Sequence, residues 1–80
     1  MAKTFVELQI DDAEVRKQLI YAAFFVDENI EDIIAEDNGL TIVHGAAVDT
    51  ANLTEQVHKL HRRFTNHEYA FKQEIYYENR

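Results

Sequence analysis

The chain has 80 residues, of which 46% are hydrophobic, and this predicts one folded domain over residues 1–80 with a small core. It contains no cysteine and no serine, which excludes disulfides, thiolate metal sites and acyl transfer through either side chain, and a reducing cytoplasm fits best. The net charge of −7 argues against direct nucleic-acid binding, and no uncharged stretch is long enough to span a membrane.

Residues 4–10 are predicted to form a strand because apolar side chains alternate along them. The side chains expected to face the core are Val6, Leu8 and Ile10. A helix is predicted to follow, with Asp11 as its N-cap and Glu14 reaching back to the backbone. Its apolar residues stand at helical spacing: Val15, Leu19, Ala22 or Ala23, and Val26. Residues 21–26 are apolar on every side, so a buried last turn and a short strand remain alternatives.

The dipeptide Asn38-Gly39 predicts a two-residue hairpin turn, since both residues tolerate a positive φ. The strand before it ends at Asp37, and the returning strand covers residues 40–44. In this register Ala35 faces Ile42, and the core face carries Ile33, Ala35, Leu40, Ile42 and His44. His44 therefore points inward, where a buried histidine with a satisfied hydrogen bond is expected rather than a catalytic base.

A long amphipathic helix is predicted from Asp49 onward. Its apolar stripe consists of Leu53, Val57, Leu60, Phe64, Phe71 and Ile75. A second helix-start pattern begins at Thr65. An unbroken helix to residue 78 would be about 43 Å long, whereas a compact chain of this size has a radius of gyration of about 12 Å. The helix is therefore expected either to break near Thr65 or to project and need a partner.

The predicted order is strand, helix, strand, strand, helix, an α+β two-layer sandwich with both helices on one face of a three-stranded sheet. It is close to a ferredoxin-like unit that lacks its last strand. If the first two strands are neighbours, they should be parallel and joined by a right-handed crossover. Such a sheet has open edges that can pair with another chain.

Glu55, His58 and His61 lie at helical spacing, and a Glu-x-x-His pair is a motif of di-iron helix bundles. Those bundles use the motif twice, and this chain has one copy. A solvated polar face is therefore favoured, and neither a metal nor another cofactor is expected.

Arg62 and Arg63 belong to the only basic cluster. They could hold a carboxylate or phosphate of a partner, or pair with the six acids of residues 27–37. The aromatic residues near the end could form a partner surface, although Phe71 and Ile75 could equally complete the core. The predicted partner-binding residues are Arg62, Arg63, Tyr69, Phe71, Ile75 and Tyr76.

Residues 68–73 read Glu-Tyr-Ala-Phe-Lys-Gln. This segment resembles the Asp-Tyr-x-Leu-Arg-Glu stretch of small accessory proteins in the His-Xaa-Ser peptide-modification systems. Tyr69 is the identical residue, and Lys72 stands where those proteins have arginine. The resemblance implies an accessory role in peptide modification, and no site residue follows from it.

The leading functional hypothesis is a non-enzymatic interaction module that acts through its C-terminal helix or a sheet edge, as a homodimer. One alternative is an acidic inhibitor whose residues 27–37 mimic spaced phosphates of nucleic acid. A second is the accessory role in peptide modification. The last is a metal-dependent enzyme that uses Glu55, His58 and His61.

Overall fold

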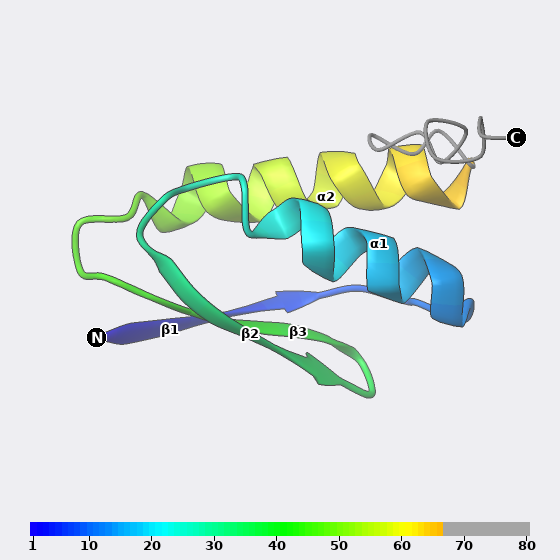
Figure 1. The fold of residues 1–80 in the computed structure, drawn as a ribbon, viewed down its shortest axis with the longest axis horizontal. Coiled ribbons are helices and arrows are strands. Elements are labelled where there is room, and N and C mark those ends of the chain that lie inside the picture. The colour runs from blue at the N-terminus through cyan, green and yellow to red at the C-terminus, as the bar shows by residue number, and fades with distance from the viewer. Residues whose placement is uncertain (67–80) are drawn as a thin grey trace, which may run out of the picture.

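The computed structural model describes residues 1–66; residues 67–80 lie outside the described part. The elements are β1 (Ala2–Glu7), α1 (Ala13–Ala23), β2 (Ile30–Glu36), β3 (Gly39–His44) and α2 (Thr50–Thr65). The strands form an antiparallel sheet in the order β1-β3-β2, and both helices cover one of its faces (Figure 1). The predicted α+β sandwich and its β-α-β-β-α order are confirmed.

The first two strands are not neighbours, because β3 lies between them, so the condition for a parallel pair with a right-handed crossover is not met. β3 is the most deeply buried strand, and Leu40 and Ile42 are both fully buried. Placing this apolar strand in the centre removes more hydrophobic surface from water than placing it at an edge would. As a consequence, β1 and β2 each keep one unpaired edge within the described residues.

The hairpin register also differs from the prediction. β2 ends at Glu36 and β3 begins at Gly39, so Asp37 and Asn38 form the turn, and Ala35 pairs with Leu40 rather than with Ile42. The φ angle of Gly39 lies outside the left-handed region, but a Cβ on this residue would overlap the Val6 carbonyl oxygen. Gly39 is therefore required by the close approach of β1 and not by a positive φ. The predicted core face is kept, except that Ala35 is exposed.

The helix starts show one correction and one confirmation. The N-cap of α1 is Asp12 and not Asp11; its Oδ1 accepts from the Glu14 amide at 2.8 Å. The N-cap of α2 is Asp49, as predicted. α1 ends at Ala23 and a turn follows, so residues 21–26 form neither a complete last helical turn nor a strand.

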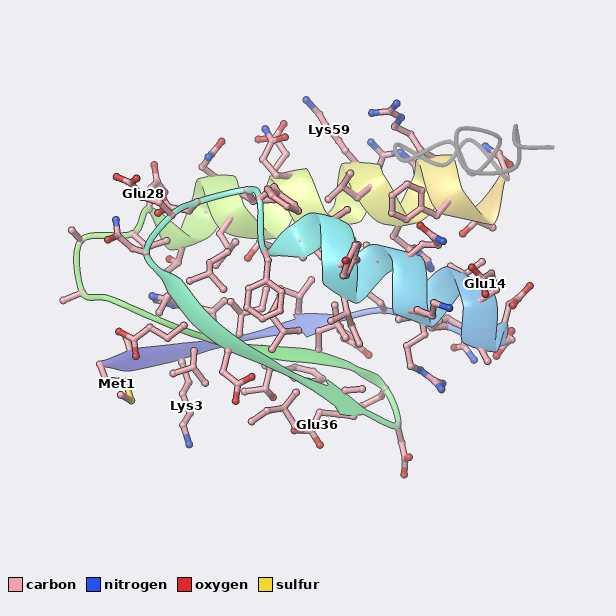
Figure 2. The ribbon with its side chains drawn as sticks, in the orientation of Figure 1. Met1, Lys3, Glu14, Glu28, Glu36 and Lys59 are labelled. Atoms are coloured by element: carbon pink, nitrogen blue, oxygen red, sulfur yellow. The ribbon has the colours of Figure 1, made fainter. Side chains whose placement is uncertain are left out.

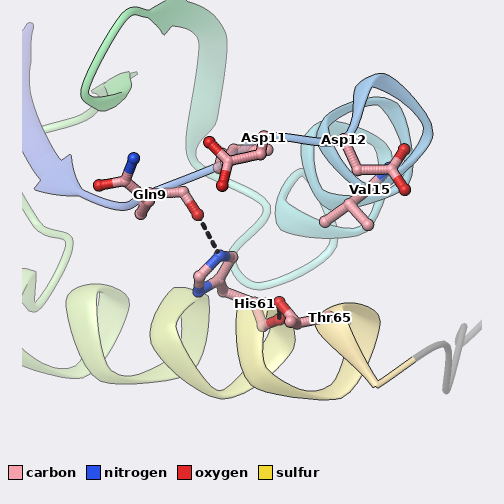
Figure 3. A pocket seen from close by; sticks show the side chains of 7 residues that line it. Gln9, Asp11, Asp12, Val15, His61 and Thr65 are labelled. Atoms are coloured by element: carbon pink, nitrogen blue, oxygen red, sulfur yellow. Dashed lines mark hydrogen bonds between the residues drawn. The ribbon is translucent and has the colours of Figure 1, made fainter.

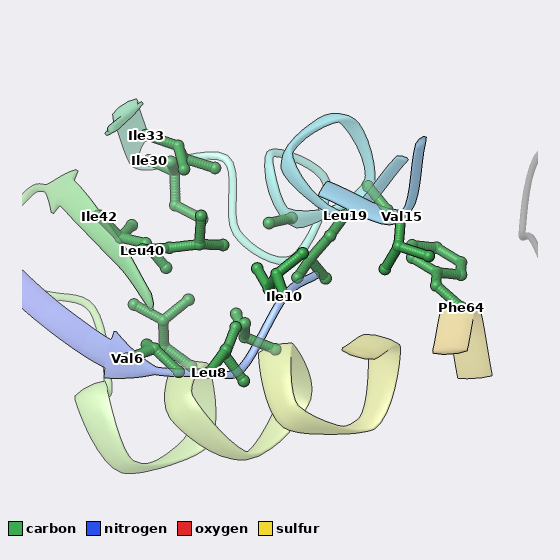
Figure 4. Close-up of a cluster of buried hydrophobic side chains, with 14 of the residues drawn as sticks. Val6, Leu8, Ile10, Val15, Leu19, Ile30, Ile33, Leu40, Ile42 and Phe64 are labelled. Atoms are coloured by element: carbon green, nitrogen blue, oxygen red, sulfur yellow. The ribbon is translucent and has the colours of Figure 1, made fainter. Parts of the chain in front are cut away.

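One cluster of buried apolar side chains fills the space between the sheet and the helices (Figure 4). The alternation predicted at the start of the chain holds, since Val6, Leu8 and Ile10 are all buried, although β1 itself covers Ala2–Glu7. α2 contributes Leu53, Val57 and Phe64, whereas Leu60, another residue of the predicted stripe, is only partly buried. α2 ends at Thr65 with Asn66 as its C-cap, and the part of the predicted stripe with Phe71 and Ile75 lies outside the described residues.

Candidate functional site

The predicted partner-binding residues divide into two groups. Arg62 and Arg63 are exposed in the last turn of α2, and no ion pair joins them to the acids of residues 27–37 within the described part of the chain. The other predicted residues lie outside the described part: Tyr69, Phe71, Ile75 and Tyr76. Of the predicted set, the described part of the chain therefore contains Arg62 and Arg63 alone.

The residues considered for a metal site are also not assembled. Glu55 forms an ion pair with Lys59, with 3.9 Å between Oε2 and Nζ. His61 Nε2 donates to the carbonyl oxygen of Gln9 at 3.0 Å, so this histidine ties α2 to the segment after β1. In the described chain, no three side chains of His, Cys, Asp or Glu are close enough together to hold a metal ion.

A pocket of about 160 Å³ lies beside that histidine, between the segment after β1, the start of α1 and the end of α2 (Figure 3). Its volume is below the range of about 300–1,000 Å³ typical of small-molecule sites. Three of its polar groups already serve the fold, since Asp12 caps α1, His61 binds the Gln9 carbonyl, and the Thr65 hydroxyl donates to the His61 carbonyl. We assign the pocket no ligand.

His44 is buried with both ring nitrogens in hydrogen bonds, as predicted. Nδ1 lies 2.8 Å from the Gly45 carbonyl oxygen, and Nε2 lies 2.7 Å from the Thr4 hydroxyl. A carbonyl oxygen can only accept, so Nδ1 carries a proton, and in the neutral ring the Thr4 hydroxyl donates to Nε2. The ring is 1% exposed and fixes the end of β3 against β1.

The free edge of β1 is the feature that stands out from the rest of the surface. In the β1–β3 register, Leu8 stands opposite Asn38, and its amide donates to the Asn38 carbonyl oxygen at 3.0 Å. Because backbone groups alternate in direction along an antiparallel strand, the even-numbered residues of β1 bind β3. The amides and carbonyls of Lys3, Phe5 and Glu7 therefore point away from the sheet, where no strand of residues 1–66 pairs with them.

The free edge of β2 is different, because its own residues protect it. The same alternation directs the amide of Ile33 outward, and the Asp32 carboxylate accepts from it at 2.8 Å. An irregularity between Ile30 and Asp32 interrupts the strand. Exposed carboxylates flank the edge at Glu31, Asp32 and Glu36. Bulges and charges are the usual means by which proteins prevent an edge from pairing with another chain.

We call the face of the sheet away from the helices the open face. The register places on it the side chains of Lys3, Phe5, Glu7, Asp32, Ile34, Glu36, Thr41 and Val43. Lys3 and Glu36 project from this side in Figure 2. Phe5 is 47% exposed and Ile34 is 43% exposed.

The charges of β1 on the open face are not matched inside the sheet. On its β3 side, Lys3 stands opposite Val43 and Glu7 stands opposite Gly39. Neither charge takes part in an ion pair within residues 1–66. An opposite charge directly across from either residue would have to come from a strand added at the free edge of β1.

Sequence reasoning did not single out Lys3, Phe5 or Glu7. The signal was present, since a base, an aromatic ring and an acid alternate along the first strand. It was missed because the strand was predicted to begin at residue 4, which leaves Lys3 outside it.

Comparisons of the chain with protein-family models, curated proteins and solved structures found no match. Over residues 1–66, no helix has both the length and the apolar character needed to cross a bilayer.

Proposed function

We propose that the protein is a small non-enzymatic interaction module of the cytoplasm that binds a protein partner through the free edge of β1. The observation that supports this is the contrast between two edges of one sheet. Both edge strands carry charged side chains, but the β2 edge is also interrupted and partly capped by Asp32, whereas β1 pairs with β3 without a register shift and no hydrogen bond within residues 1–66 occupies the outward amides of Lys3, Phe5 and Glu7. An unprotected edge offers a row of main-chain donors and acceptors to an incoming strand.

Photo-crosslinking in cells that contain the protein tests this proposal. A photoreactive amino acid would replace Phe5 in one variant and Ile34 in another; the two positions are similarly exposed, at 47% and 43%, but lie on opposite edge strands. We expect one discrete adduct from position 5 and none from position 34. Mass spectrometry would identify the partner, and calorimetry with the purified partner would give its affinity.

Removing one outward donor provides the control for this experiment. Glu7→Pro deletes an amide that points away from β3, so the β1–β3 ladder stays intact. Glu7→Gln removes the same charge but keeps the amide. We expect Glu7→Pro to abolish the adduct at position 5, and Glu7→Gln to retain it. Equal adducts from positions 5 and 34, or an adduct that survives in Glu7→Pro, would show that the edge is not the binding site.

The same proposal includes self-association through residues near the end of the chain. Phe71 and Ile75 continue the apolar stripe beyond the described residues, and a twofold homodimer is the commonest way to cover such a stripe. We expect sedimentation at 100 μM to give twice the monomer mass of 9.4 kDa, and Phe71→Asp with Ile75→Asp to give a folded monomer. A wild-type mass near 9.4 kDa contradicts the dimer.

A second candidate function is mimicry of nucleic acid, which the exposed acids on and beside β2 favour. Glu28, Glu31, Asp32, Glu36 and Asp37 are exposed, and none is paired with a base within the described part of the chain. Binding of this kind weakens steeply with salt, whereas strand addition depends mainly on main-chain hydrogen bonds. Partner affinity measured at low and high salt separates the two functions.

The accessory role in peptide modification remains a further proposal. It is compatible with an edge that binds an extended chain, and the segment behind the resemblance, residues 68–73, lies outside the described residues.

A further inference from the structure

The free part of the β1 edge is complementary to itself. Its outward backbone groups belong to Lys3, Phe5 and Glu7, and the carbonyl oxygen of Gln9, just after β1, already accepts from His61 of α2. Phe5 is therefore the middle of the three free residues. If β1 pairs antiparallel with a copy of itself about Phe5, the Lys3 of each copy stands opposite the Glu7 of the other.

We infer that the partner at the β1 edge is a second copy of this chain, joined by antiparallel pairing of the two β1 strands around a twofold axis at Phe5. The inference rests on the proposed function, which assigns binding to this edge, and it names the partner. Each copy offers the other the same row of outward donors and acceptors, as an isologous contact requires. The two three-stranded sheets become one continuous six-stranded sheet.

The position of the twofold axis follows from the residues that would stand opposite each other. Outward residues pair only with outward residues, so the register can shift only in steps of two. A shift toward the end of β1 sets Lys3 opposite Gln9, whose carbonyl oxygen is already in use. A shift the other way sets Glu7 opposite Met1 and leaves Lys3 against an aromatic ring. The register centred on Phe5 is the one that gives both charges an opposite charge.

The side chains of β1 lack in one copy what a second copy supplies. On the β3 side, Lys3 stands opposite Val43 and Glu7 stands opposite Gly39, and neither charge has an ion-pair partner within residues 1–66. In the dimer each charge gains an opposite charge across the new strand pair. Phe5, which is 47% exposed, faces the same ring of the other copy. Cross-strand aromatic pairs and opposite-charge pairs both stabilise a sheet.

The helices are compatible with the same axis. α2 packs against β1 and α1 packs against β2, on one face of the sheet (Figure 1). A twofold axis perpendicular to the sheet keeps both helix layers on one side, so the α2 helices of the two copies flank the joint and run antiparallel. Phe71 and Ile75 follow α2 in the chain. The self-association proposed for them and the β1 joint can therefore belong to one twofold dimer.

Charge exchange in the full-length protein tests the inference by sedimentation equilibrium. Lys3→Glu or Glu7→Lys alone sets two like-charge pairs in the joint, and we expect each to raise the dissociation constant of the dimer about tenfold or more. The two changes shift the net charge of −7 in opposite directions, so a general repulsion between acidic copies would not weaken the dimer in both. Lys3→Glu combined with Glu7→Lys restores both opposite-charge pairs, and we expect this variant to dimerise as the wild type does.

Mixing the two single variants provides a second rescue. One copy then carries acids at positions 3 and 7 and the other carries bases, so every cross-strand pair has opposite charges. We expect a heterodimer at a concentration at which each variant alone is monomeric, and a variant that failed to fold could give neither rescue. Glu31→Lys is the matched control, since it makes the same change of charge at an exposed position of β2, on the other edge. We expect it to dimerise as the wild type does.

A single introduced cysteine tests the register. The chain has no cysteine of its own, and residues directly opposite in a hydrogen-bonded antiparallel pair have Cα atoms about 5.5 Å apart, which a disulfide can bridge. Phe5→Cys should therefore oxidise to a covalent dimer much faster than Ile34→Cys, which lies on the opposite edge strand with a similar exposure. Equal rates for the two variants would mean that position 5 does not face its own copy.

Several outcomes would overturn the inference. They are a wild-type protein that remains monomeric, single charge variants that dimerise as the wild type does, and a double variant that dimerises as weakly as the single variants. A dimer that is lost in Phe71→Asp with Ile75→Asp but unchanged by either β1 charge variant would exclude β1 from the joint.

The identity of the cellular adduct separates this inference from the proposed function. An adduct at position 5 that consists of two copies of the chain supports both. If the adduct contains a different protein, the edge binds a partner as proposed and the second-copy inference alone fails. If position 5 gives no adduct and sedimentation shows no dimer, both fail.

Discussion

The two edges of the sheet differ although both border the same central strand. β2 uses one of its own side chains to cap its edge, since Asp32 accepts from the Ile33 amide. Its Glu36 is bound on the other side, toward β3, by the Thr41 hydroxyl. β1 leaves its outward backbone groups and both of its charged side chains without partners in the described residues. A protein that needs to avoid nonspecific strand pairing has to protect every edge that is not in use. This comparison is the reason why we propose a binding role for the β1 edge.

The largest expected effect comes from proline substitutions that compare an amide of β1 facing β3 with an amide of β1 facing outward. Thr4→Pro removes an amide that binds β3 and the hydroxyl that binds buried His44, so we expect a loss of at least about 3 kcal/mol of unfolding free energy. Lys3→Pro removes an outward amide, and we expect a loss below about 1 kcal/mol. Urea denaturation measures both values. Similar losses for the two variants would mean that the inward and outward sides of β1 are assigned wrongly.

The element order could be predicted from the sequence because it depends on local patterns. Alternation identified the first strand, Asp49 marked the start of α2, and the inward position of His44 followed from parity along β3. The hairpin register could not be predicted in the same way. Gly39 is fixed by the approach of the Val6 carbonyl, which is a contact between residues far apart in the sequence.

The candidate site was the hardest part to predict for a related reason. Whether a strand is central or at an edge depends on the strand order, and no local pattern along β1 distinguishes the two. Lys3 and Glu7 gain their significance only from what stands opposite them on β3. The basic and aromatic residues near the end of the chain were easier to recognise, but only Arg62 and Arg63 of the predicted set fall within the described residues.

An intermediate effect is expected at Gly39, where β3 meets both edge strands. A Cβ there would overlap the Val6 carbonyl oxygen and lie 2.9 Å from Cζ of Phe5, so Gly39→Ala should cost about 1–3 kcal/mol. Gly45→Ala is the control, since a Cβ at that position would meet only the Asn29 Cβ at 3.8 Å. We expect Gly45→Ala to be neutral or to stabilise the protein by up to about 1 kcal/mol. A neutral Gly39→Ala in a urea melt would contradict the close approach of β1.

A smaller effect is expected when the protection of the β2 edge is removed. Asp32→Ala frees the outward amide of Ile33, and we expect a loss of about 0.5–1.5 kcal/mol together with faster aggregation in light scattering. Asp32→Asn keeps an acceptor oxygen and should resemble the wild type in aggregation. If both variants aggregate equally, charge and not the capped amide protects this edge.

The smallest effect compares one carboxylate from each edge. Glu7 of β1 and Glu36 of β2 both pair with Gly39, which lies between them on the central strand β3. Removal of either carboxylate therefore relieves the same electrostatic repulsion between the two. Only Glu36 is bound within the sheet, through the Thr41 hydroxyl at 3.0 Å. This bond is exposed, so Glu36→Ala should cost about 0.5 kcal/mol more than Glu7→Ala, which should lie within about 0.5 kcal/mol of the wild type. Urea denaturation of the two variants measures both losses of unfolding free energy. A larger loss for Glu7→Ala than for Glu36→Ala would mean that Glu7 stabilises the fold. In that case Glu7 would have a structural role, and its charge would not support a binding role for the β1 edge.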